Sequence, residues 1–123
     1  MSEYYGVSMV AAAALEKGVF VKNSSGEAAQ CTADTDAIIG VTLNSAAAGE
    51  LVTIVTSGLA HVQASAALTA FGEISCDANG RAKDGASADT IGAIAGNEVG
   101  VAASGGKYAL VPVTVLARKY TKA

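Results

Sequence analysis

Short runs of alternating apolar and polar residues, rich in valine, isoleucine and threonine, follow one another along most of the chain. Such runs favour β-strands, because β-branched side chains fit a pleated, half-buried surface. The clearest runs are GVFVKN (18–23), AIIGVTLN (37–44), LVTIVTSG (51–58), LAHVQAS (59–65) and ALVPV (109–113). Turn residues separate them, as in NSSG (23–26) and DANG (77–80). The pattern predicts an all-β fold, a compact barrel or sandwich of roughly eight to ten short strands.

Glycines recur in two copies of one order, which indicates an internal duplication. The matched glycines are Gly18, Gly26, Gly40 and Gly49 in the first copy and Gly72, Gly80, Gly92 and Gly106 in the second. Between the second and third glycines, both copies have a polar stretch that leads into an apolar pair, CTADTDAIIGV (31–41) and ASADTIGAI (86–94). The repeats span about 17–56 and 71–113. Two copies are too few for a stacked array, so we expect one domain of two similar halves.

The two ends of the chain are expected to be extended segments outside the main strand pattern. MVAAAALEKG (9–18) has the composition of a helix that stops at a glycine, but its alanine run has no periodic apolar face, so an extended strand is equally compatible. ASAALTAFG (64–72) is compatible with one helical turn, and the sequence after VPVTVL (111–116) leaves the alternating pattern. The predicted parts are an N-terminal arm or short helix (1–14), a single β domain (15–116) and a basic C-terminal tail (117–123).

The supply of large apolar side chains is small for a chain of this length. Hydrophobic residues make up 51% of the 123 residues, but the chain has no Trp, two Phe and four Tyr. Much of the hydrophobic fraction is therefore alanine, which contributes little buried area to a core. We expect the chain to gain further apolar contact by oligomerising or by docking on a larger body.

The charge and hydropathy of the chain argue against nucleic acid and membranes as partners. Its net charge is −3, from 8 Lys and Arg against 11 Asp and Glu, whereas binding phosphates requires a basic face. Only ARKYTKA (117–123) is locally basic, and we expect its cations to be solvated. The apolar run VSMVAAAAL (7–15) is far shorter than the roughly 18 residues of a membrane span. Glu3 precedes it, whereas a signal peptide begins with cations.

The residues that carry most enzyme chemistry are few and dispersed. His61 is expected to be a surface or interface residue of a strand, because the spacing identifies no nucleophile and no orienting carboxylate for it. Cys31 and Cys76 are expected to be buried, free thiols, and together with His61 they lack the spacing of a metal site.

The acidic and glycine-rich motifs are explained by turns. The acidic residues of DTD (34–36) and DANG (77–80) are expected to cap turns, since neither motif has the twelve-residue arrangement of a calcium loop. SGGK (104–107) is typical of a hairpin rather than a phosphate loop. No catalytic residue, cofactor or metal is predicted. We expect a non-enzymatic structural component that binds through distributed surfaces.

The order and spacing of these motifs resemble the capsid decoration, or cement, proteins of tailed bacteriophages. The resemblance covers about residues 15–113. It rests on GVFV (18–21), IIGVTLNSAAAGELVTIVTSG (38–58), ALTAFGEISCDANGRAKDG (67–85), TIGAIAG (90–96) and ALVPV (109–113). It implies a protein that binds the outer surface of an assembled phage head and stabilises it by bridging neighbouring major capsid subunits.

The resemblance also implies partners and a location. It implies a homo-oligomer, with a trimer favoured and a dimer possible, on the outer capsid surface of a virion assembled in the host cytoplasm. N-terminal arms in this family often lie across neighbouring capsid subunits and add main-chain pairing. On that basis SEYYGVSMV (2–10) is the expected arm, with Tyr4 and Tyr5 as anchoring aromatics and Val7 and Met9 as further capsid contacts.

Two other functions remain open at this point. An extracellular appendage or adhesin subunit would predict a disulfide between Cys31 and Cys76 and an exported precursor. A small enzyme or glycan-binding β domain would predict a concave patch that includes His61 or a tyrosine.

Overall fold

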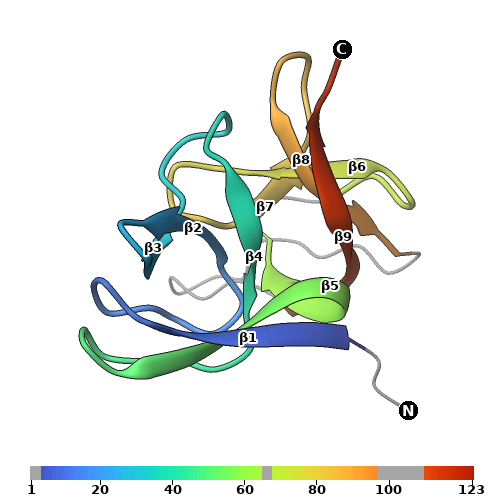
Figure 1. Ribbon diagram of the computed structural model, residues 1–123. Helices are drawn as coiled ribbons and strands as arrows, with labels where there is room; N and C mark the ends of the chain where they lie inside the picture. The colour runs from blue at the N-terminus through green and yellow to red at the C-terminus, as the bar shows by residue number, and fades with distance from the viewer. Residues whose placement is uncertain (1–3, 65–67, 97–109) are drawn as a thin grey trace, which may run out of the picture.

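The computed structural model describes residues 4–64, 68–96 and 110–123 (Figure 1). In this part of the chain nine strands form one antiparallel sheet, and no helix is present. The strands are β1 (Tyr4–Val10), β2 (Phe20–Ser24), β3 (Glu27–Gln30), β4 (Ile38–Thr42), β5 (Leu51–Gln63), β6 (Glu73–Cys76), β7 (Ala82–Asp84), β8 (Thr90–Ala95) and β9 (Leu110–Thr121). The prediction of an all-β fold is confirmed.

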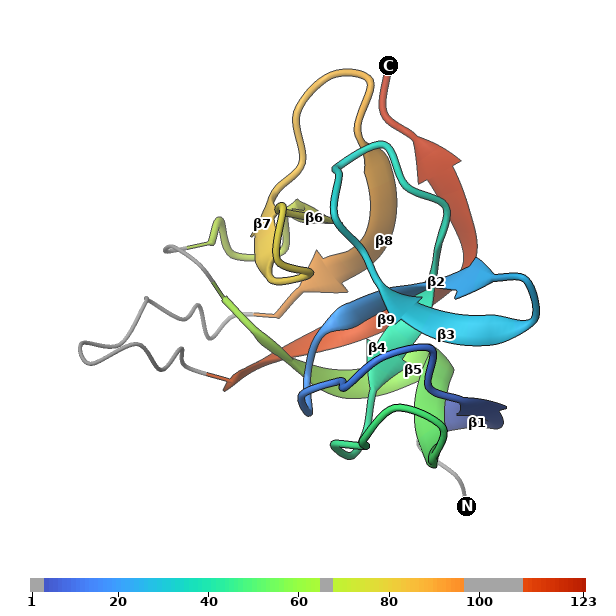
Figure 2. The same cartoon turned by 90° about the vertical axis from the view of Figure 1, so that its left-hand side faces the viewer.

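The strands follow the order β3-β2-β4-β5-β9-β8-β6-β7, and β1 pairs with β5 outside this path. The 13-residue strand β5 curves strongly, with Gly58 at a φ of 99° (Figure 1). Its first part pairs with β1 and β4, and its second part pairs with β9. In both views β1 lies at one end of the molecule and β8 near the other (Figure 2). The single sheet therefore wraps around the core instead of forming two stacked sheets.

Two hairpins form where turn residues predicted them. Ser25 and Gly26 join β2 to β3 with φ angles of 53° and 89°, and the Asn23 side chain accepts a bond of 2.9 Å from the Gly26 amide. Gly80, with a φ of 71°, lies in the turn between β6 and β7. Positive φ is accessible to glycine at little cost, which explains why glycine occupies these turns. Both predicted hairpins are confirmed, whereas the duplication of the whole half stays a prediction.

The helical alternative for residues 9–18 is wrong. Residues 9 and 10 belong to β1, and Ala11 and Leu15 each form an isolated bridge, to Ala28 and Ala46. Ala11 and Leu15 are buried, at 1% and 3% exposure, whereas the alanines between them are exposed. Pairing with distant strands therefore outweighs the helix propensity of an alanine run that has no continuous apolar face.

The segment 64–72 is also not helical in its described residues. A turn closes it, in which the Gly72 amide donates to the Thr69 carbonyl at 3.0 Å. Residues 65–67 lie outside the described part, as does the predicted SGGK hairpin (104–107).

The predicted end of the strand pattern at residue 116 is wrong. β9 continues to Thr121, because Tyr120 and Thr121 pair with Ile91 and Thr90 of β8. Backbone bonds beyond the strand hold Lys122 as well, to residues 88 and 89. Residues 117–121 are thus part of the sheet, not a solvated tail.

Two clusters of small and medium apolar side chains form the core. The larger cluster takes residues from both ends of the sheet order, including Phe20 of β2, Ile38 of β4 and Ile74 of β6. The smaller cluster lies between the first strands of the chain and includes Val52 and Ile54 of β5. Phe20 is the largest of the fully buried side chains, and those next to it in size are isoleucines and valines.

Candidate functional site

The residues predicted to contact a capsid, Tyr4, Tyr5, Val7 and Met9, all lie in β1. This strand pairs with β5 along its whole length, so these residues belong to the chain's own sheet and do not form an arm that extends away from it. Tyr5 and Val7 are exposed, at 78% and 45%, whereas Met9 is half-buried against the smaller cluster. The strand therefore presents Tyr5 and Val7 to solvent and uses Met9 for packing.

β1 pairs with one strand only, β5, among the residues that the structure describes. Its sequence YYGVSMV contains no charged residue and no proline, two usual means of protecting an edge strand. A bulge between Tyr5 and Gly6 is its one irregularity. The strands at the ends of the sheet order are better protected: β3 has four residues with Glu27, and β7 has three with Lys83 and Asp84. β1 is therefore the edge most open to a partner.

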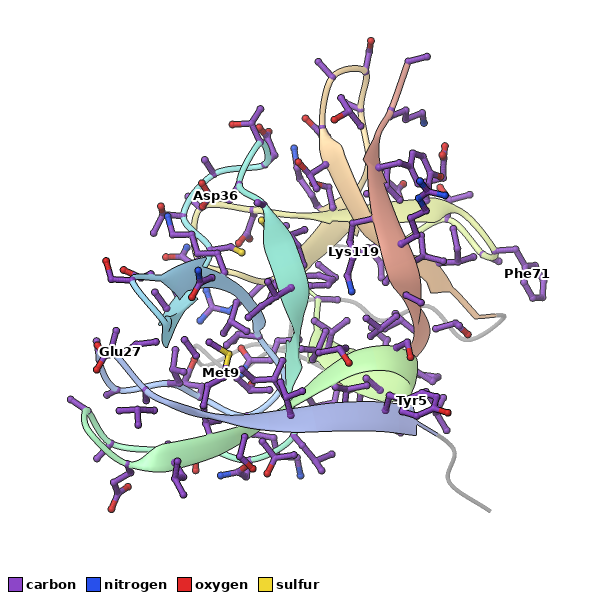
Figure 3. All side chains as sticks on the ribbon, in the orientation of Figure 1. Tyr5, Met9, Glu27, Asp36, Phe71 and Lys119 are labelled. Atoms are coloured by element: carbon purple, nitrogen blue, oxygen red, sulfur yellow. The ribbon has the colours of Figure 1, made fainter. Side chains whose placement is uncertain are left out.

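A groove of about 580 Å³ lies between β1 and the strands β4 and β9. Its walls include Tyr5, Val7, Ile39, Thr56, Ala117 and Lys119. In Figure 3 Lys119 points from β9 toward β5, and Tyr5 lies at the end of β1. Four strands thus form the groove, and three of them, β1, β5 and β9, are far apart in the sequence.

Lys119 is a half-buried cation in this groove. Its Nζ donates a hydrogen bond of 2.7 Å to the Thr56 carbonyl, and the Thr56 hydroxyl donates one of 3.2 Å to the Tyr5 carbonyl. No carboxylate of the described residues lies within 4.0 Å of it. Burial lowers the pKa of Lys119, because a less solvated ammonium is less stable.

A second hollow, of about 450 Å³, lies beside His61. Its walls include Leu43, Leu59 and Leu110, which are 41–42% exposed, and Lys17. His61 is exposed, as predicted for a surface strand residue. The glycan-binding alternative predicted a concave patch at His61, but leucine walls offer few hydrogen bonds to sugar hydroxyls.

Asp36 and Asp77 cap turns, as predicted, whereas the Asp34 side chain pairs with Lys83 instead. The Asp36 carboxylate accepts hydrogen bonds from the Thr32 and Ala33 amides at 2.8 and 3.1 Å. Burial raises the pKa of Asp36, but these amides and the ammonium of Lys22 at 3.1 Å outweigh it, so the pKa lies below its ordinary value. Asp77 accepts two amide bonds in the DANG turn, at 2.8 and 3.0 Å.

A second group of charges surrounds Lys83. Its Nζ lies 2.8 Å from Asp34 and 3.2 Å from Asp89, and the hydrogen bond to Asp34 is the main cause that raises the pKa of Lys83. Asp89 is buried, which raises its pKa. The hydrogen bonds that Asp89 accepts from the Ala86 amide, at 2.8 Å, and from Lys83 have a larger and opposite effect, so its pKa lies below the ordinary value. Within the described ranges, no group of three or more His, Cys, Asp or Glu side chains is placed to hold a metal ion.

Both cysteines are free and fully buried, which confirms that expectation. The adhesin alternative predicted a disulfide between them. The Cys76 thiol donates to the Ala33 carbonyl at 3.1 Å. The hydrogen bond with the neighbouring Cys76 raises the pKa of the Cys31 thiol, and burial raises it further.

The described residues contain no helix with the length and hydropathy that a membrane span requires.

Sequence analysis missed Lys119, which it assigned to a solvated tail. The missed pattern is the alternation in β9, where Val111, Val113 and Val115 are all buried. Ala117 and Lys119 continue the same odd-numbered series and line the groove. Alternation gives only a weak signal for the site, because Ala117 is exposed and Lys119 is half-buried.

Comparison with known proteins gives a likeness among solved structures. No protein-family model matches the chain, and no curated protein is significantly similar to it. Among solved structures, the chain is similar to the head fiber gp8.5 N base of bacteriophage phi29. The TM-score is 0.68 and the identity 14%, and the alignment covers 94% of this chain and 97% of that chain. At this identity the likeness shows a shared fold.

Proposed function

We propose that the chain is a non-enzymatic structural protein that binds the outer surface of a bacteriophage head. The observation that carries the proposal is the fold shared with a phage head fiber base, over nearly the full length of both chains. The sequence motifs support the same location independently, since they resemble capsid decoration proteins.

In its specific form, the proposal is a decoration protein that stabilises the head by bridging neighbouring major capsid subunits. The chain acts as a homo-oligomer, for which a trimer is the first expectation. Tyr4, Tyr5, Val7 and Met9 of β1 are the proposed contact strand. The exposure of Tyr5 and Val7 supports this choice, because exposed aromatic and apolar side chains are common anchors of interfaces. Many copies of a modest contact reinforce a shell through avidity.

A second candidate is an attachment base, which binds the head without reinforcing it. The similarity to a protein described as the base of a head fiber favours this candidate. The two candidates differ in their effect on the stability of the head.

Binding to expanded, undecorated heads of the matching virus tests both candidates. The purified chain is mixed with heads, the heads are pelleted, and bound copies are counted while the melting temperature of the heads is followed. A copy number that saturates at a value set by the shell lattice, with a raised melting temperature, supports the decoration protein. The same saturation without a change in melting temperature supports the attachment base, and no binding contradicts both.

Substitution of Tyr5 tests the proposed contact strand in the same assay. Tyr5→Ala is expected to lower the number of copies bound at a subsaturating concentration. Phe71→Ala is the matched control, because Phe71 is an aromatic residue of similar exposure, 71%, and lies outside β1. Equal binding by both variants would contradict a contact role for Tyr5.

A further inference from the structure

We propose that the groove between β1, β4 and β9 binds an acidic peptide segment of the shell protein, with one carboxylate held by Lys119. This inference rests on the proposed function, because it specifies the chemistry of the segment that the chain contacts on the head. The groove lies directly beside the proposed contact strand, since Tyr5, Gly6 and Val7 form one of its walls.

The first argument is the charge of Lys119. An ammonium group has three donors, and Lys119 uses one of them within the described part, on the Thr56 carbonyl. Partial burial has removed some of its water, as its lowered pKa indicates, and no carboxylate of the described residues lies close enough to compensate for the loss. A charge-assisted hydrogen bond to an incoming carboxylate would compensate for it.

The second argument is the contrast with other partly buried cations. Lys22 pairs with Asp36 at 3.1 Å, and Lys83 pairs with Asp34 at 2.8 Å. These lysine side chains are 31% and 30% exposed, so the fold supplies a carboxylate to cations at such positions. Lys119 departs from this rule in the groove, where a partner has access.

The third argument is the apolar surface around the charge. Val7, Ile39 and Ala117 line the groove near Lys119, and the volume of about 580 Å³ admits several side chains. A peptide that places one carboxylate on Lys119 and apolar neighbours on these residues would satisfy both surfaces. A free inorganic anion would use the charge and leave the apolar walls exposed.

Lys119 also ties β9 to β5 through Thr56, so its structural role must be separated from binding. Lys119→Met keeps the aliphatic stem and removes the charge, whereas Lys119→Arg keeps the charge. Arg118→Met is the matched control, because Arg118 is the exposed neighbour and does not line the groove. Melting temperatures of the variants report any structural loss.

Binding to expanded, undecorated heads is measured for the wild type and the three variants. Lys119→Met is expected to raise the concentration at half-saturation by about tenfold or more, because a desolvated charge pair loses one partner. Lys119→Arg should restore binding to within a few-fold of wild type, and Arg118→Met should change it little. Similar binding by Lys119→Met and wild type overturns the inference and leaves the proposed function standing.

Cross-linking of decorated heads gives a readout that does not depend on the stability of a variant. A carbodiimide joins an amine to a carboxylate in direct contact, and mass spectrometry locates the bond. The expected product joins Lys119 to an Asp, a Glu or the terminal carboxyl group of the shell protein. Wild-type protein that saturates heads without this product overturns the inference alone. Failure of wild-type protein to bind heads overturns the proposed function and this inference with it.

Discussion

The two halves of the sheet follow the same order of pairing but differ at one strand. In each half a hairpin pairs with a third strand, which pairs with a long strand: β2, β3, β4 and β5, then β6, β7, β8 and β9. An isolated parallel bridge joins Ala11 to Ala28 in the first half and Ala64 to Ala82 in the second, at positions 53 and 54 residues apart. The pairing order is therefore alike in the two halves, while the duplication of the sequence stays a prediction.

The difference concerns the strand that precedes each hairpin. In the second half, the end of β5 takes this position and pairs with β9. It also contacts Gly18, because the Gln63 amide donates a hydrogen bond of 2.7 Å to the Gly18 carbonyl. In the first half it is taken by β1, which pairs with β5 alone in the described residues. The same place in the order is thus paired on both sides in the second half and on one side in the first, which leaves β1 as an edge strand of the described sheet.

The largest expected effect tests whether the halves share one core. Phe20 is fully buried in the larger cluster, and its amide donates to the Gly80 carbonyl of the other half at 2.7 Å. Phe20→Ala is expected to lower the free energy of unfolding by about 3–5 kcal/mol, because it leaves a cavity between the halves. Urea denaturation followed by circular dichroism measures the loss.

Phe71→Ala is the control for this experiment. Phe71 is 71% exposed, so its loss is expected to change the free energy of unfolding by less than about 0.5 kcal/mol. A loss below about 1 kcal/mol for Phe20→Ala would contradict a shared core.

The next effect distinguishes matched glycines of the two halves. A Cβ at Gly40 of β4 would lie 2.1 Å from the Val55 carbonyl oxygen, which the sheet holds in place. A Cβ at Gly92 of β8 would lie 3.0 Å from the Ile38 side chain, a wider approach and one to a side chain instead of the backbone. Gly40→Ala is therefore expected to cost about 3 kcal/mol and Gly92→Ala about 1 kcal/mol. Thermal and urea unfolding measure both, and equal losses would show that the two glycines have equivalent surroundings.

A third effect concerns the aspartates that cap the turn before the third strand of each half, Asp36 and Asp89. The native pKa of each lies below the ordinary value of 3.8. The unfolded chain therefore binds more protons in acid, so their contribution is present above pH 3.8 and is lost as the pH falls through the native pKa values. Asp89→Asn is expected to cost about 2 kcal/mol near neutral pH and little in strong acid, because its hydrogen bonds are charged only when Asp89 is ionised.

Asp36→Asn is the paired variant for this measurement. The Asp36 side chain is 19% exposed and that of Asp89 is 7% exposed, so the loss should be smaller for Asp36. Urea unfolding at neutral and acid pH gives both values. A loss for Asp89→Asn that is independent of pH would assign the effect to side-chain shape instead of charge.

The smallest perturbation requires no substitution. Cys31 lies in the first half and Cys76 in the second, and both are 0% exposed. Iodoacetamide is expected to label them slowly and at the same rate in the native protein, because both become accessible when the whole molecule unfolds. Mass spectrometry over time measures the two rates. Faster labelling of one cysteine would mean that its half opens independently.

Local patterns predicted much of the fold correctly. The NSSG and DANG turns fixed both hairpins, because their glycines adopt positive φ. In β5, alternation predicts Leu59 and His61 on one side of the strand and Ala60 and Val62 on the other, and the structure exposes the first pair and buries the second. These predictions succeeded because turn chemistry and two-residue periodicity depend on residues close together in the sequence.

The ends of the chain and the groove depend on distant residues. β1 has glycine and serine within its apolar run, and its strand conformation comes from pairing with residues 51–58 of β5. The last residues of β9 are charged and polar, and they are held by Thr90 and Ile91 of β8. Local composition carries no information about such pairings, and the groove requires four strands to be placed together. For this reason Lys119 was assigned to a tail.

The position of β9 also has a consequence for the order in which the chain folds during synthesis. β9 is made after the other eight described strands, yet it lies between β5 and β8 in the middle of the sheet. The second half therefore cannot complete its sheet until residues 110–121 have left the ribosome. Sheets built from such non-local pairs fold slowly, on the order of milliseconds to seconds. The sheet of the described residues thus cannot be completed before β9 has been made, while the hairpins β2–β3 and β6–β7 can form as soon as they emerge.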